Sequence, residues 1–175
     1  SMLNLVVALL MGASPAAELR MNDLAAVGTH NSYKLAVPPE EMAAMVAVRG
    51  QAALGIDYAH RPLAEQLDAG ARQLEIDVVA DPRGGRYATP LTALKHGTVL
   101  SPGLAAALRQ PGFKVLHMPD VDFRSSCPTF VACLAEVKAW SKAHPDHVPI
   151  LILLNAKDGP ASLPGGVKPL AFDEK

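Results

Sequence analysis

The stretch Gly28-Thr29-His30-Asn31-Ser32-Tyr33 decides how this chain is interpreted, because it places a histidine and an amide directly after an apolar run. That run, Leu24-Ala25-Ala26-Val27, predicts a short buried strand. In α/β folds, ligands bind beyond the carboxyl ends of the strands. The stretch therefore predicts a functional loop at a strand end.

Two later stretches repeat this arrangement. Residues 73–80 predict a strand that carries Glu75 and Asp77, and residues 113–117 predict a strand that ends in His117. Side chains two residues apart on a strand point to the same face, so the two carboxylates share one side. We expect both histidines, both carboxylates and Asn31 to converge on one site.

The remaining pattern alternates between helix and strand signals. Helices are predicted at residues 39–49, 62–68, 102–109 and 129–143, and a continuous apolar strand at residues 150–154. Such a continuous apolar run is typical of a parallel strand buried on both faces. Four strand-plus-helix units predict an α/β fold with a parallel sheet. A TIM (β/α) barrel contains eight such units, so we expect residues 18–175 to form the amino-terminal half of one.

Composition limits the functional classes. The chain has 175 residues, of which 50% are hydrophobic and 19% charged, which is typical of a globular protein with a real core. Its formal net charge of -1 provides no broad basic surface that would bind nucleic acid or an anionic membrane. Any partner must therefore be recognised locally.

The amino terminus predicts export. Residues 2–12 form an apolar segment that is too short to span a bilayer, and Ser14-Pro15-Ala16 resembles a cleavage site. We interpret residues 1–17 as a signal peptide and expect a secreted or periplasmic protein with no transmembrane segment. The alternative is a buried strand or helix, because no lysine or arginine precedes the apolar segment.

The only two cysteines, Cys127 and Cys133, are close in sequence and flank Pro128. A pair this close fits a local disulfide that fixes a loop to the start of a helix, and a disulfide agrees with export. The alternative is two buried thiols that act as small hydrophobic groups.

Taken together, the motifs resemble the calcium-dependent phosphatidylinositol-specific phospholipase C family of bacterial type, within the phospholipase C-like phosphodiesterases. The matching segments are residues 28–33, 58–78 and 117–123, the cysteine pair with Trp140, and the strand that ends in Lys157. They cover nearly all of residues 24–158.

The resemblance implies a phosphoric diester hydrolase with a phospholipid or inositol phosphodiester as substrate and transient contact with a membrane surface. It implies that His30 is the general base and His117 the general acid, and that Lys157 contacts the substrate phosphate. The implied metal ligands all offer oxygen, which favours Ca²⁺, or else Mg²⁺. They are Asn31, Glu75, Asp77 and Asn155.

One position departs from the family pattern. Resembling enzymes usually have an acidic residue where this chain has Asn155. Two alternatives therefore stay open: a non-catalytic phospholipid-binding member of the fold, and a glycerophosphodiester phosphodiesterase. Asn31 argues against the second, because those enzymes usually have arginine there. We interpret His60, His96, His144 and His147 as surface or packing residues.

Overall fold

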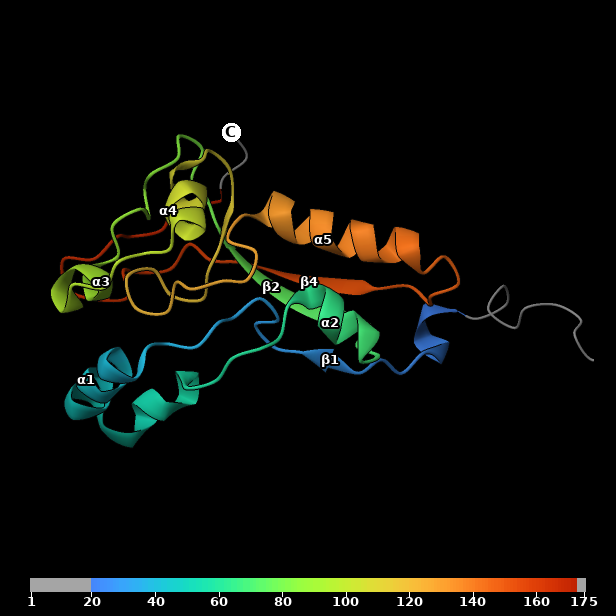
Figure 1. The fold of residues 1–175 in the computed structure, drawn as a ribbon, viewed down its shortest axis with the longest axis horizontal. Helices are drawn as coiled ribbons and strands as arrows, with labels where there is room; N and C mark the ends of the chain where they lie inside the picture. The colour runs from blue at the N-terminus through green and yellow to red at the C-terminus, as the bar shows by residue number, and fades with distance from the viewer. Residues whose placement is uncertain (1–19, 173–175) are drawn as a thin grey trace, which may run out of the picture.

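The computed structural model describes residues 20–172, so the predicted signal peptide lies outside the described residues. A small open sheet forms the centre of the fold (Figure 1). Its middle strand, β2 (Gln73–Val79), pairs in parallel with β1 (Gly28–Thr29) and β4 (Leu151–Ala156). A fourth strand, β3 (Lys114–Val115), pairs with the end of β2. The described sheet is a mixed α/β arrangement and not a closed barrel.

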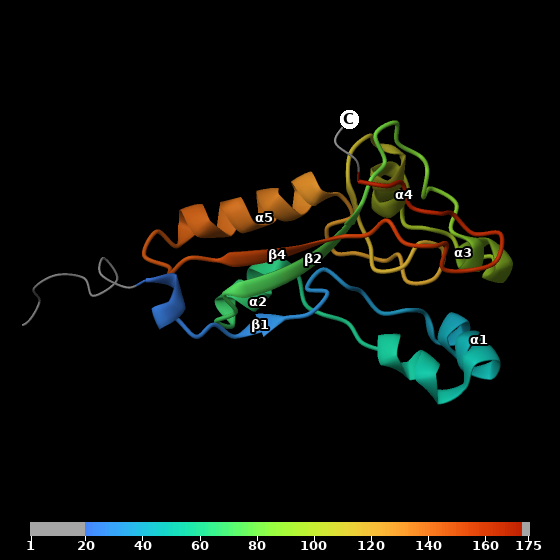
Figure 2. The same cartoon turned by 180° about the vertical axis from the view of Figure 1, so that it is seen from behind.

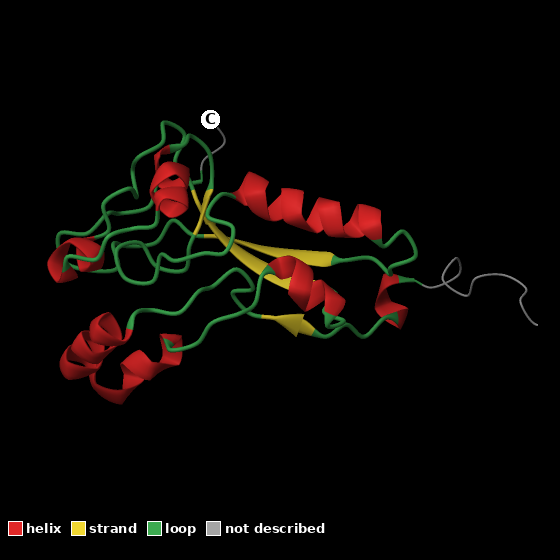
Figure 3. Cartoon of the chain, viewed as in Figure 1, coloured by secondary structure: helices red, strands yellow, loops and turns green. Residues whose placement is uncertain are grey.

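Two helices cover one face of β2. Helix α2 (Leu63–Asp68) and helix α5 (Phe130–Ala143) lie along the sheet in Figures 1 and 3, and both contribute to one core cluster. Three alternate residues of β2, namely Leu74, Ile76 and Val78, belong to the same cluster. The period of two therefore sends one set of side chains into the core and leaves Glu75 and Asp77 on the opposite face.

The other helices begin and end at recognisable residues. Helix α1 (Pro39–Arg49) has proline in its first turn and ends at Gly50, after which η3 (Gly50–Ile56) follows. Helix α4 (Pro102–Arg109) is capped by the Ser101 side chain. These bounds confirm the predictions for residues 39–49 and 102–109. Helix α3 (Leu91–His96) and the short η2 (Met21–Asp23) were not predicted.

The first strand prediction was wrong in its position. Residues 24–27 are not a strand and are mostly exposed, and β1 consists only of the next two residues, Gly28 and Thr29. The Val27 carbonyl accepts hydrogen bonds from the backbone of Arg72 and Gln73, so the chain joins the sheet only where β2 begins. β1 is an edge strand, and no described element covers the apolar run that precedes it.

The third strand prediction was wrong in its direction. β3 is antiparallel to β2, with Val78 opposite Val115. A parallel strand requires the chain to return to the amino end of its neighbour. Here the segment with α3 and α4 stays beyond the carboxyl end of β2 (Figure 1), so β3 enters from that end.

The fourth strand is present and parallel, but it is not buried on both faces. Most of β4 is exposed, including Leu153 at 56%. Among the residues that the structure describes, β2 is its only strand neighbour, so its far edge is open. The apolar run therefore predicted the strand correctly and its burial wrongly.

The cysteine prediction is confirmed. Cys127 and Cys133 form a disulfide, and both are buried in the core cluster under α5. Within residues 20–172, no helix is long and apolar enough to cross a membrane.

A buried ion pair attaches α1 to the rest of the protein. The Glu41 carboxylate accepts hydrogen bonds from Arg124 at 2.6 and 3.1 Å and from the Thr98 hydroxyl at 2.8 Å. Burial raises the pKa of Glu41, but these hydrogen bonds and the Arg124 charge outweigh burial and hold the pKa below its usual range. The ionised carboxylate is therefore stabilised by folding.

This ion pair predicts an acid-dependent loss of stability. The folded-state pKa of Glu41 lies below the ordinary value of 4.5. The contribution of Glu41 to the free energy of unfolding is therefore complete above pH 4.5 and is lost as pH falls through the folded-state pKa. We expect Glu41→Gln to lower the free energy of unfolding at neutral pH by about 2 kcal/mol. The difference from wild type should shrink below pH 4.5 in thermal melts. Glu40→Gln, at an exposed neighbouring position, is the control, and a difference that does not change with pH would contradict the assignment.

Candidate active site

The loop after β1 is fixed on β2 at Glu75. The Ser32 backbone N–H donates to the Glu75 carbonyl at 3.0 Å, and the Glu75 N–H donates to the Ser32 hydroxyl at 2.9 Å. The Asn31 N–H donates to the Glu75 carboxylate at 2.8 Å, with Asn31 in the left-handed region at φ 50°. Asparagine tolerates this conformation better than most residues. The loop sequence thus sets the position of its own histidine and amide.

Glycine is required at the start of this loop. A Cβ at Gly28 would lie 2.7 Å from the Gln73 carbonyl oxygen, a distance that real Cβ atoms essentially never show. The close approach of β1 to β2 therefore depends on this glycine. It brings His30 within reach of the β2 carboxylates.

The two carboxylates on β2 are both buried but have different partners. Asp77 accepts hydrogen bonds from the Lys157 ammonium and from the Asn155 amide, both at 2.8 Å. Glu75 lies 3.4 Å from His30 Nε2, and no lysine or arginine in residues 20–172 pairs with it. Asp77 is therefore neutralised by a neighbouring cation, whereas Glu75 is not.

His117 is held by a buried aspartate that the sequence analysis did not single out. Its Nδ1 lies 2.9 Å from the Asp122 carboxylate, which also lies 3.4 Å from the buried Lys34 ammonium. The Lys157 ammonium donates to the His117 carbonyl oxygen at 2.7 Å. Asp122 falls inside the motif at residues 117–123, so sequence spacing offered a signal for it. Nothing in the pattern distinguished Lys34.

Two tyrosines orient the amide of Asn31. The Tyr33 hydroxyl donates to Asn31 Oδ1 at 3.1 Å, and Asn31 Nδ2 donates to the Tyr58 oxygen at 2.8 Å. Burial raises the pKa of both phenols, and the nearby Asp77 charge raises the Tyr33 pKa further. Both tyrosines therefore stay neutral and serve as hydrogen-bonding groups.

The two histidines differ in access. The His30 side chain is 73% exposed, whereas that of His117 is 20% exposed. His30 is therefore accessible to a ligand from solvent. Because Asp122 occupies Nδ1 of His117, its Nε2 is the nitrogen that remains available.

The predicted site residues thus form two sets of contacts around the neighbouring carboxylates of β2. His30 and Asn31 contact Glu75, while Asn155 and Lys157 contact Asp77, and Lys157 also contacts His117. Of the histidines left as packing residues, His60 lies 2.9 Å from the His30 carbonyl oxygen, and His144 stacks on Trp140. These contacts place the predicted residues around Glu75 and Asp77, and they do not assign catalytic or metal-binding roles.

The donor chemistry of this group fits a hard cation. Within residues 20–172, no group of three or more His, Cys, Asp or Glu side chains is arranged to hold a metal ion, so a cation here would also need amide oxygens. Among the described residues, the buried Glu75 carboxylate has no basic partner other than His30, and such a charge is costly without a cation. The side-chain oxygens of Asn31 and Asp77 each accept a hydrogen bond and retain a lone pair, and Asn155 donates from its amide nitrogen, which leaves its oxygen available.

The comparison with known families agrees with this geometry. A family model described as phosphoinositide phospholipase C, Ca²⁺-dependent, matches residues 19–175. The chain belongs to this family. Membership indicates a hydrolase of the phospholipase C class that acts on a lipid. No curated protein and no solved structure matches the chain significantly.

The contact between Asp122 and His117 predicts a positioning role in this phospholipase C-like chain. Asp122→Asn keeps the size of the side chain but removes its charge, so His117 loses the group that fixes its Nδ1. We expect kcat to fall about tenfold or more with little change in KM. Asp81→Asn is the matched control, because Asp81 forms a buried pair with Lys114 outside the site. Equal losses of kcat in both variants would reduce Asp122 to a structural role.

Proposed function

We propose that this chain is a bacterial-type phosphatidylinositol-specific phospholipase C in which His30 is the general base and His117 the general acid. The observation that supports this most is the pair of histidines at the two ends of one carboxylate face. His30 lies beside Glu75, and Lys157 connects Asp77 to the backbone of His117. A phosphodiester in this space would meet a base, an acid and a cation.

The proposed reaction is an attack of the inositol 2-hydroxyl on phosphorus. The exposed His30 ring takes the hydroxyl proton as the new P–O bond forms, and the bond to the glycerol oxygen breaks. His117 donates the proton on Nε2 to that leaving oxygen, while Asp122 holds Nδ1. The products are a cyclic inositol phosphate and diacylglycerol. Histidine suits both roles because its unperturbed pKa lies near neutrality.

A bound Ca²⁺ would neutralise charge on the phosphate, and Asn31, Glu75, Asp77 and Asn155 would hold it. Glu75 is the principal candidate, because its charge lacks a lysine or arginine partner among the described residues. Lys157 would contact the phosphate as a point charge, and its contact with Asp77 keeps the ammonium in place.

We also propose that the protein is exported after removal of residues 1–17, and that the described sheet belongs to a phosphodiesterase TIM barrel. The Cys127–Cys133 disulfide supports export, because disulfides persist in oxidising compartments. The three parallel strands, with α2 and α5 on one face and the carboxylates on the other, support the barrel.

The histidine roles predict a large loss of turnover. His30→Ala and His117→Ala should each lower kcat with phosphatidylinositol by at least about two orders of magnitude, as expected for removal of a general acid or base. Melting temperatures should stay close to wild type for the exposed His30. His144→Ala, at the far end of α5, is the control. Near-normal release of cyclic inositol phosphate by either variant would remove that histidine from the mechanism.

Asn155 allows a test of the cation site in which one of the two measurements does not depend on turnover. In Asn155→Glu the hydrogen bond to Asp77 becomes a contact between two carboxylates, which should destabilise the metal-free protein and strengthen calcium binding. We expect the calcium concentration for half-maximal activity to fall roughly tenfold and the calcium-induced rise in melting temperature to increase. Glu75→Gln should have the opposite effect on both measurements. A destabilised Asn155→Glu protein that calcium does not rescue would exclude Asn155 from the ligand set.

A further inference from the structure

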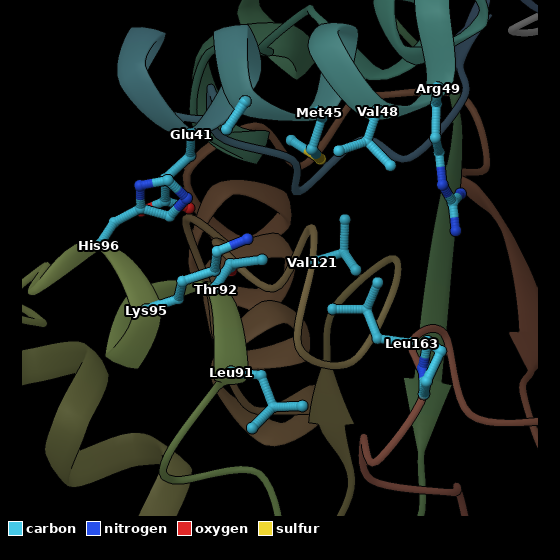
Figure 4. A pocket seen from close by; sticks show the side chains of 12 residues that line it. Glu41, Met45, Val48, Arg49, Leu91, Thr92, Lys95, His96, Val121 and Leu163 are labelled. Atoms are coloured by element: carbon cyan, nitrogen blue, oxygen red, sulfur yellow. The ribbon is translucent and has the colours of Figure 1, made fainter.

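A cavity separate from the carboxylate face lies between α1 and α3. It has a volume of about 410 Å³, within the range of small-molecule sites. Figure 4 shows Met45 and Val48 reaching down from α1, with Val121 and Leu163 below them, and Leu91 of α3 also lines the cavity. These walls are apolar and converge on one space. The cavity therefore suits an alkyl chain.

The polar side chains of the cavity are mainly basic. Arg49, Lys95 and His96 surround the apolar walls. Within residues 20–172, no carboxylate forms an ion pair with Arg49 or Lys95, and Arg49 contacts only the Ser162 carbonyl, at 3.5 Å. The one acidic residue is Glu41, which lies near His96 and whose carboxylate is neutralised by Arg124. The cavity thus combines apolar walls with unpaired positive charge.

Exposed apolar side chains lie on the same two helices. Val48 on α1 is 81% exposed, and Val99, just after α3, is 92% exposed. The hydrogen bond from the Thr98 hydroxyl to the Glu41 carboxylate holds the segment that contains Val99 against α1. Exposed apolar side chains favour contact with an apolar environment rather than with water.

The cavity lies at the same end of the molecule as the candidate active site. Both α1 and α3 lie beyond the carboxyl ends of the parallel strands in Figures 1 and 2. Val121, which forms part of the wall, directly precedes the Asp122 that holds His117. A lipid surface that meets this end therefore also meets the carboxylate face.

We propose that this cavity binds one acyl chain of an anionic phospholipid in a bilayer surface, with Arg49 and Lys95, on opposite sides of the cavity, facing the anionic headgroups. The basic rim selects an anionic lipid, and the apolar walls require an acyl chain. The chain has almost no net charge, so attraction must come from this local cluster and not from the whole surface. The inference does not rest on the proposed catalysis, because phospholipids other than phosphoinositides would bind in the same way.

Vesicle sedimentation tests the basic rim. Wild type, in EDTA to exclude calcium bridges, should bind vesicles of phosphatidylcholine and phosphatidylglycerol more tightly than pure phosphatidylcholine vesicles. The Arg49→Gln, Lys95→Gln double variant should bind the mixed vesicles at least about tenfold more weakly, since each basic residue contributes about 1 kcal/mol at an anionic surface. Lys138→Gln with Lys142→Gln, two exposed lysines on α5, is the matched control and should bind like wild type. Equal binding by all three proteins would overturn the proposal.

Calorimetry with soluble probes tests the acyl chain. Dihexanoyl phosphatidylglycerol below its micellar concentration should bind to wild type, and its deacylated headgroup should not. Met45→Trp fills the cavity and should abolish binding of the acylated probe without preventing folding. Equal binding of the headgroup alone would reduce the site to an anion site and overturn the proposal. If wild type is dimeric and does not bind the acylated probe, this face would be assigned to contact with a second copy of the chain. That result would also overturn the proposal.

Discussion

The burial of two carboxylates on the middle strand is the constraint on which the rest of this structure depends. Glu75 and Asp77 lie opposite an apolar face that packs against α2 and α5, so they cannot leave the interior without disrupting the core. Buried charges require partners, and every nearby element supplies one. The loop after β1 supplies the Asn31 N–H and His30, and the segment at the end of β4 supplies Asn155 and Lys157. The electrostatic requirement of β2 thus gathers the residues of the candidate active site.

The sequence predicted the shared face of Glu75 and Asp77 better than it predicted the sheet around them. Two carboxylates that lie two residues apart on an apolar strand point to the same face, because side chains alternate between the two faces of a strand. This spacing alone therefore predicts that Glu75 and Asp77 lie on the face opposite the apolar side chains. Helices with a proline start or a polar cap, such as α1 and α4, were equally predictable, since their signals lie within a few residues. Asp122 lies inside the motif at residues 117–123, but its contact with Lys34 joins residues far apart in sequence, and no local pattern carries that contact.

The errors in the sheet share a physical origin. An apolar run shows that a segment can be buried, but burial depends on what lies across from it. Residues 24–27 and the leucines of β4 have the composition of buried strands, yet they lie at the two edges of the sheet among the residues that the structure describes. The direction of β3 likewise depends on a contact with a residue outside the strand. The buried ion pair between Lys114 and Asp81, at 3.0 Å, holds the start of β3 beside the end of β2. Such a contact joins residues far apart in sequence and fixes the strand as antiparallel.

The turn between Met118 and Asp122 links the two functional surfaces of the molecule. Asp120 adopts φ 68°, a conformation that an aspartate adopts only when its surroundings compensate for the strain. Its carboxylate accepts hydrogen bonds from the backbone N–H groups of Leu91 and Val167, so α3 and the carboxyl-terminal segment both hold the turn. The same turn presents Val121 to the cavity and Asp122 to His117. A ligand that packs against Val121 would therefore act on the backbone that positions the proposed general acid, so the proposed lipid contact and the proposed catalysis share one turn.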